Sequence, residues 1–230
     1  NKKNKAVYWM PAGTWRAEGI VWNATHIRTP VNITVLAGGE HVQPVNLNAG
    51  LVRFDTRLAP GAPLIDARLS WAVYPDKTGI DGKRKRLVNF LNKPVKEVFM
   101  LPAGEWNVEG SLWNHNHLKF KTTLKVEAGG QLPHEVSMNA AKVRLDVTID
   151  GKPTSDAVTF SLREKTADLA GKRKVIATLY NRKPGHVTYF PAGDHELHAS
   201  LWKDRNVSGS QKVEIKAGNE QVLRVNLTSE

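Results

Sequence analysis

The sequence predicts an all-β protein made of tandem seven-stranded β-sandwiches, immunoglobulin-like or prealbumin-like, of which the first is incomplete. Three observations predict this fold. The tripeptide Pro-Ala-Gly recurs at Pro11, Pro102 and Pro191, at intervals of 91 and then 89 residues. Apolar and polar residues alternate between turn signals, as in strands with one buried face. Gly, Pro and Asn separate these segments, and no long segment has a helical period.

Other landmarks repeat at the same offsets as Pro-Ala-Gly. Trp22 aligns with Trp113 and Trp202, and the turn that starts at Ala37 recurs at Ala128 and Ala217. A period near 90 residues fits a small sandwich domain, whereas solenoid repeats have 20 to 50 residues.

The repeat predicts the domain organisation. Residues 1–50 are expected to be the C-terminal half of one sandwich, and residues 51–141 and 142–230 two complete ones. The first unit lacks about three strands, so either it starts inside a domain or another element covers its core. The short connections predict domains placed end to end in a stiff rod.

The strands of the middle unit follow from the alternation. Phe120, Thr122, Leu124 and Val126 are expected to face the core, and Val45 and Leu47 are expected to do so in a strand of the first unit. The predicted strands are Val52–Leu58, Arg68–Tyr74, Leu87–Leu91, Val95–Leu101, Trp106–Trp113, Lys119–Glu127 and Glu135–Asn139.

Pro-Ala-Gly is predicted to be a corner between two strands. Proline cannot donate to a strand ladder and ends the incoming strand, while glycine allows the positive φ with which the next strand begins. This chemistry needs no ligand, so a structural role is preferred to a binding loop.

Composition limits the function classes. The chain has no cysteine, which excludes disulfides, thiolate metal sites and a cysteine nucleophile, and it has no apolar run long enough for a transmembrane helix. The net charge of +11 is spread over the three units, which disfavours nucleic acid as a partner and indicates a general attraction to anionic surfaces.

The segment around Pro-Ala-Gly, the V-x-A-G-G turn and the stretches NAGLVRFDTRL and LSWAVY resemble a bacterial family. They are similar to the prealbumin-like or carboxypeptidase-regulatory-like sandwich repeats found beside von Willebrand factor A domains in envelope proteins. The resemblance implies a non-catalytic, extracytoplasmic spacer or binding module. No von Willebrand A metal motif is visible.

Two features are candidate contact sites. Trp22, Trp113 and Trp202 lie on the polar parity of their strands, where they either cover a core edge, contact a neighbouring domain or partner, or stack on a sugar. A basic loop also recurs between the second and third strands of both complete units, and it either binds an anionic polymer or lipid head group or is a solvated turn. Its cations are Lys83, Arg84, Lys85, Arg86, Lys172, Arg173 and Lys174.

Catalytic and metal sites have little support. His195 and His198 are expected on opposite faces of a strand, and His115 and His117 alone make a weak metal site. No nucleophile elbow or phosphate loop is present. We therefore expect no enzyme activity, cofactor or metal.

The sequence leaves three functions open. The first is a spacer and protein-interaction segment of a larger bacterial envelope or secreted protein, periplasmic or extracellular, with other protein domains as partners, including a missing upstream domain. The second is a module that binds polysaccharide or an anionic surface. The third is a filament subunit that a neighbouring chain completes.

Overall fold

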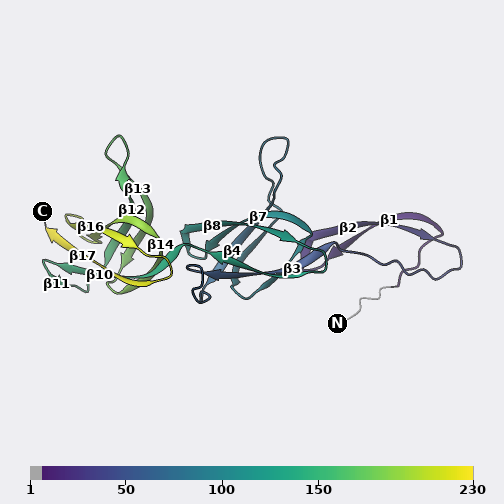
Figure 1. Ribbon diagram of the computed structural model, residues 1–230, viewed down its shortest axis with the longest axis horizontal. Helices are drawn as coiled ribbons and strands as arrows, with labels where there is room; N and C mark the ends of the chain where they lie inside the picture. Colours follow the sequence, from purple (N-terminus) through teal and green to yellow (C-terminus); the bar gives the residue numbers. More distant parts are fainter. Residues whose placement is uncertain (1–6, 230) are drawn as a thin grey trace.

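The computed structural model describes residues 7–229, without the side chains of Asn116 and Ser229, and its regular structure is all β. The predicted fold class is confirmed. The elements form a row of a hairpin, a middle sandwich and a last sandwich (Figure 1). Among the described residues no helix is long and apolar enough to cross a membrane.

The first unit is an antiparallel hairpin of β1 (Gly13–Val21) and β2 (Ala24–Val35). Residues 36–48 form no strand, so the strand expected around Val45 and Leu47 is wrong. Its counterpart in the middle unit pairs with that unit's first strand, whereas residues 36–48 pair with no strand among the described residues. An extended segment without a ladder partner has no hydrogen bonds to hold it as a strand.

The middle sandwich consists of two sheets with the strand orders β6-β3-β9 and β5-β4-β7-β8. Its strands are β3 (Ala49–Arg57), β4 (Arg68–Pro75), β5 (Val88–Pro94), β6 (Val98–Pro102), β7 (Gly104–Leu112), β8 (His115–Val126) and β9 (Gln131–Ser137). Phe54 and Trp71 stack in its core with ring centroids 4.2 Å apart. On β8, Phe120, Leu124 and Val126 are buried, as the alternation predicts.

The last sandwich repeats this plan around a second core. Its strands are β10 (Ala140–Ile149), β11 (Lys152–Pro153), β12 (Val158–Ala167), β13 (Arg173–Arg182), β14 (His186–Pro191), β15 (Gly193–Leu201), β16 (Val207–Ile215) and β17 (Glu220–Ser229). Phe160, Phe190 and Leu197 are among its fully buried residues. A short pairing between β16 and β17 joins its two sheets.

The first and last strands of each sandwich run parallel, because β3 pairs with β9 and β10 with β17 in parallel. The chain therefore enters a sandwich at one end and leaves it at the other. The next domain continues the row directly, since Met138, just after β9, and Ala140, the first residue of β10, donate backbone hydrogen bonds to Arg57 and Leu58 at the end of β3. This topology gives the end-to-end arrangement its physical basis.

Each Pro-Ala-Gly corner is closed by the side chain that stands two positions after its glycine. The indole N–H of Trp15 donates to the carbonyl oxygen of Pro11, and Trp106 does the same to Pro102, both at 2.9 Å. In the third copy His195 replaces tryptophan and its Nε2 lies 3.2 Å from the Pro191 carbonyl oxygen. The corner glycines have φ of 145°, 143° and 131°, which side chains disfavour. These contacts give the repeated corner a structural role.

Candidate functional site

The hairpin of the first unit docks onto the middle sandwich through a small joint, which we call the first joint. The Nε2 N–H of His26 donates to the carbonyl oxygen of Met100 at 2.8 Å, and its ring packs edge-on against Phe90. Ile27 follows and is only 1% exposed, although the rest of its hairpin lacks a covering sheet. Burial of this one side chain therefore marks where the hairpin meets the next domain.

The second joint repeats this contact between the two sandwiches. The Nε2 N–H of His117 donates to the carbonyl oxygen of Tyr189, again at 2.8 Å, and Leu118 is buried like Ile27. The Tyr189 side chain belongs to the last domain but packs against the core of the middle one. The His117 ring also lies 5.8 Å from that of Phe190. The β7–β8 hairpin tip of one domain is thus fixed on β14 of the next.

Three histidines and an arginine gather at the second joint. The His115 ring packs edge-on against the Tyr189 ring, and its Nδ1 lies 3.5 Å from the hydroxyl of buried Thr188. Burial, followed by the charges of His117, His186 and Arg182, lowers the pKa of His115 to about 4. Burial also lowers the pKa of His117 and His186. The joint is therefore built around neutral imidazoles.

The two basic loops project from the middle and last sandwiches, and we call them the first and the second finger. The first finger, residues 76–87, connects β4 to β5, and the second finger, residues 165–175, is the β12–β13 turn with its strand ends. Both extend to the same side of the row in Figure 1. Each finger has its own backbone hydrogen bond across its turn, from Gly79 to Lys83 in the first and from Asp168 to Lys172 in the second. These bonds hold the backbone that carries the cations.

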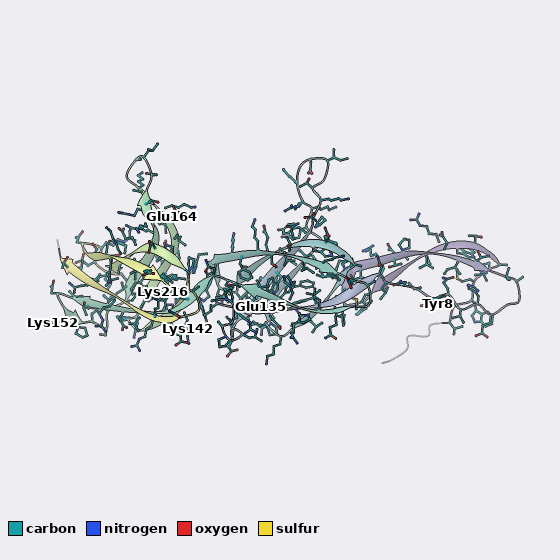
Figure 2. The ribbon with its side chains drawn as sticks, in the orientation of Figure 1. Tyr8, Glu135, Lys142, Lys152, Glu164 and Lys216 are labelled. Carbon is teal, nitrogen blue, oxygen red and sulfur yellow. The ribbon has the colours of Figure 1, made fainter. Side chains whose placement is uncertain are left out.

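The two fingers differ in how many of their cations are paired. In the second finger Arg173 pairs with Glu196 at 3.1 Å and Lys174 with Glu164 at 3.3 Å. Glu164 is labelled beside that finger in Figure 2. Among the described residues no salt bridge involves the cations of the first finger, which are Lys77, Lys83, Arg84, Lys85 and Arg86. Among the described residues the first finger therefore has five cations outside salt bridges, whereas the second finger has one, Lys172.

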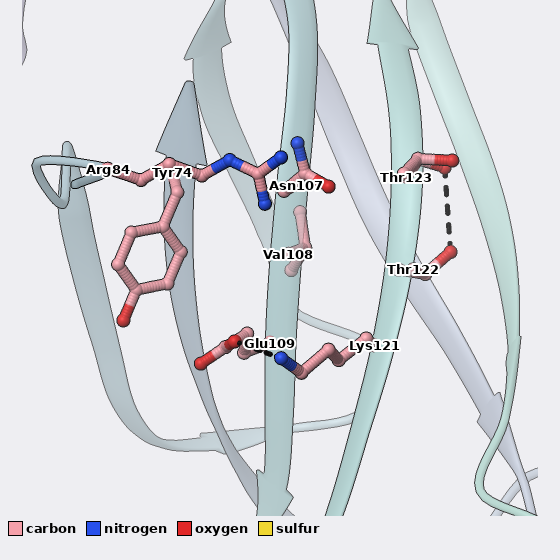
Figure 3. A pocket seen from close by; sticks show the side chains of 8 residues that line it. All are labelled: Tyr74, Arg84, Asn107, Val108, Glu109, Lys121, Thr122 and Thr123. Carbon is pink, nitrogen blue, oxygen red and sulfur yellow. Dashed lines mark hydrogen bonds and ion pairs between the residues drawn. The ribbon is translucent and has the colours of Figure 1, made fainter. Parts of the chain in front are cut away.

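Two open hollows adjoin the first finger. One, of about 570 Å³, lies within the loop and is lined by four of its cations and by one carboxylate, which are Lys77, Lys83, Arg84, Lys85 and Asp81. The other, of about 530 Å³, lies on the outer face of the β4-β7-β8 sheet at the base of the finger (Figure 3). Its lining is polar, with Tyr74 and Arg84 beside the Glu109–Lys121 ion pair of 2.9 Å. Such a lining suits a charged or hydroxylated group at the surface.

The three tryptophans are not brought together. Trp22, Trp113 and Trp202 each follow a strand at the start of a hairpin turn, one in each unit along the row. Trp22 is 91% exposed, whereas Trp113 and Trp202 are 39% and 42% exposed. Trp202 packs edge-on against Tyr180 with ring centroids 6.2 Å apart. In the complete units the tryptophan therefore partly covers its own domain and keeps an exposed surface.

The described residues offer no group of three His, Cys, Asp or Glu side chains placed to hold a metal ion. His195 is engaged in the Pro191 corner, and His198 Nδ1 lies 3.0 Å from the hydroxyl of Ser210 on the outer face. These histidines therefore have structural partners.

No protein-family model and no curated protein matches the chain. Solved structures that are similar to it include the TIE protein of Bacillus anthracis, with 15% identity over 88% of this chain and 39% of that one, and a TM-score of 0.31. They also include a minor pilin of Streptococcus agalactiae, with 14% identity, 80% and 96% coverage, and a TM-score of 0.33. A variant of a shaft pilin of Lactobacillus rhamnosus has 9% identity, 80% and 98% coverage, and a TM-score of 0.35. Likeness at this level does not extend to function.

Proposed function

We propose that this chain is a non-catalytic spacer and protein-interaction segment of a larger bacterial envelope or secreted protein. The observation that carries the proposal is the repeated joint, in which a histidine of one domain binds a backbone carbonyl of the next. A linker that only connected independent domains would need neither this hydrogen bond nor the packing of Tyr189 of the last domain against the core of the middle one.

The joints support a spacer because they resist bending. Tilting one sandwich on the other would separate His117 from the Tyr189 carbonyl and would expose the Tyr189 ring. A hydrogen bond of this type contributes about 1 kcal/mol, and burial of apolar surface contributes about 25 cal/mol per Å². Both contributions favour the docked arrangement over a tilted one.

Small-angle X-ray scattering with light scattering tests the proposal. We expect a monomer whose pair-distance distribution has the long tail of a rod. The double substitution His117→Ala and Tyr189→Ala should shorten the mean maximum dimension, while the exposed control Lys125→Ala should not. A wild-type chain as compact or as variable as the double variant would contradict the spacer. Association that grows with concentration would instead favour a filament subunit completed by a neighbouring chain.

A second candidate function is binding of a polysaccharide or another anionic surface, and the two fingers favour it. Both fingers extend from the row on the same side in Figure 1, and four cations of the first finger line a common hollow together with Asp81. A charge-based contact should weaken as salt rises, because counterions screen it. Retention on a dextran sulfate column at increasing salt tests this candidate, and retention that does not depend on salt would contradict it.

A further inference from the structure

Each finger carries a fully exposed aliphatic side chain at its tip. Ile80 of the first finger and Leu169 of the second are as exposed as in an extended chain, at 111% and 110%. In both fingers the aliphatic residue stands three positions before the sequence Lys-Arg-Lys. The two tips therefore share one pattern, an exposed aliphatic side chain followed by three cations.

The two tips also share one backbone structure. The N–H of Gly79 donates to the carbonyl oxygen of Lys83 in the first finger, and that of Asp168 to Lys172 in the second, both at 2.8 Å. Each turn contains a glycine with positive φ, Gly82 at 71° and Gly171 at 74°. The turns thus hold the aliphatic side chains out into solvent in the same way in both domains.

An exposed aliphatic side chain beside several cations distinguishes between two kinds of anionic partner, soluble polyanions and lipid bilayers. One exposed aliphatic side chain on a protein surface needs no explanation. Two at equivalent tips, each beside a cluster of cations, fit a partner that offers an apolar phase directly behind a layer of negative charge. A soluble polyanion provides only the charge, whereas a lipid bilayer provides phosphate head groups above acyl chains.

We propose that the two fingers dock on the surface of an anionic lipid bilayer. Ile80 and Leu169 enter the boundary between head groups and acyl chains, and the cations of the fingers bind lipid phosphates. Both fingers extend to the same side of the row, so one membrane surface is able to receive them together, which strengthens binding beyond that of either finger. The inference rests on the second candidate function, binding to an anionic surface, and adds the nature of that surface.

The first finger contributes more of the charge attraction than the second. Arg173 and Lys174 are already paired with Glu196 and Glu164, whereas the hollow within the first finger is lined by four cations and only one carboxylate, Asp81. Each cation near an anionic membrane contributes about a fivefold increase in partitioning. Substitutions in the first finger should therefore have the larger effect.

Co-sedimentation of the full chain with vesicles tests the proposal. The probes are vesicles of equal parts phosphatidylglycerol and phosphatidylcholine, vesicles of phosphatidylcholine alone, and soluble dextran sulfate. We expect the chain to bind the phosphatidylglycerol vesicles and to bind phosphatidylcholine much more weakly. Replacing Lys83 and Lys85 with Gln should lower partitioning about 25-fold. The matched control, Lys125→Gln with Lys212→Gln, removes the same charge from two strands and should lower it far less.

The aliphatic tips give the decisive comparison. Ile80→Ser with Leu169→Ser should lower vesicle partitioning about tenfold and leave dextran sulfate binding unchanged, while Val222→Ser, an exposed control on β17, should change neither. Vesicle binding that is unaffected by the tip substitutions would overturn the proposal. Binding to dextran sulfate without binding to vesicles would overturn it and leave the second candidate function standing. Absence of binding to both would overturn both.

Discussion

Acid should loosen the second joint, because its histidines are held neutral. Burial in the docked joint is the largest cause that lowers the pKa of His115 from the ordinary imidazole value of 6.5 to about 4. Above pH 6.5 the imidazole is neutral in both states, so the joint keeps its full stability. As the pH falls below 6.5, the separated state binds more protons than the docked state, and docking becomes weaker.

The magnitude follows from the two pKa values. At pH 5 the linkage for His115 alone comes to about 2 kcal/mol. The imidazole is partly exposed, so solvent screening reduces this to about 1 kcal/mol. A loss of about 1 kcal/mol raises the ratio of separated to docked domains about fivefold. His117 and His186, whose pKa values are also lowered, act in the same direction.

Spin-label distance measurements test this effect, and the absence of cysteine allows labels at chosen sites. With cysteines introduced at Lys125 and Lys212, the distance distribution should be narrow at pH 7.5 and broaden below pH 6. His115→Ala, which copies the alanine found at position 24 of the first unit, should reduce the broadening at a given pH. A distribution of the same width at pH 7.5 and pH 4.5 would refute the reasoning.

Two stability predictions follow from the packing inside the middle sandwich. Gly110→Ala should lower the free energy of unfolding by about 1–3 kcal/mol, because a Cβ there would collide with the Phe120 ring and would lie 2.7 Å from that of Trp71. Denaturant unfolding measures this loss, and an unchanged midpoint would show that the rings move away freely. Trp106→Phe should cost about 1 kcal/mol, because it removes the indole hydrogen bond to Pro102 at the corner; a loss too small to measure by the same method would contradict the structural role of that bond.

The alternation of residues was enough to predict the fold class and most strands. It places Phe120, Leu124 and Val126 on the buried face of β8, and the predicted strands of the middle unit differ from β3–β9 by a few residues at their ends. Period-two alternation reports which face is buried but not which strand is the neighbour. The parallel pairing of first and last strands was therefore not predictable from it.

The same limitation explains the wrong strand at Val45 and Leu47, since alternation is present there but a ladder partner is not. The joints were missed for another reason. His26 and His117 are 91 residues apart, each followed by an aliphatic residue, and this repeat was visible in the sequence. Their hydrogen-bond acceptors are backbone carbonyls, which leave no side-chain signal. The domain boundaries and the roles of the tryptophans and basic loops remain predictions.

Residual dipolar couplings of the chain at neutral pH would test the central claim, that the joints hold the sandwiches as one stiff body. If the second joint is rigid, backbone N–H couplings from residues 49–139 and 140–229 fit a single alignment tensor with the domain orientation of the structure. Two tensors of different magnitude would mean that the sandwiches reorient independently. The repeated histidine contact would then not make the chain a spacer.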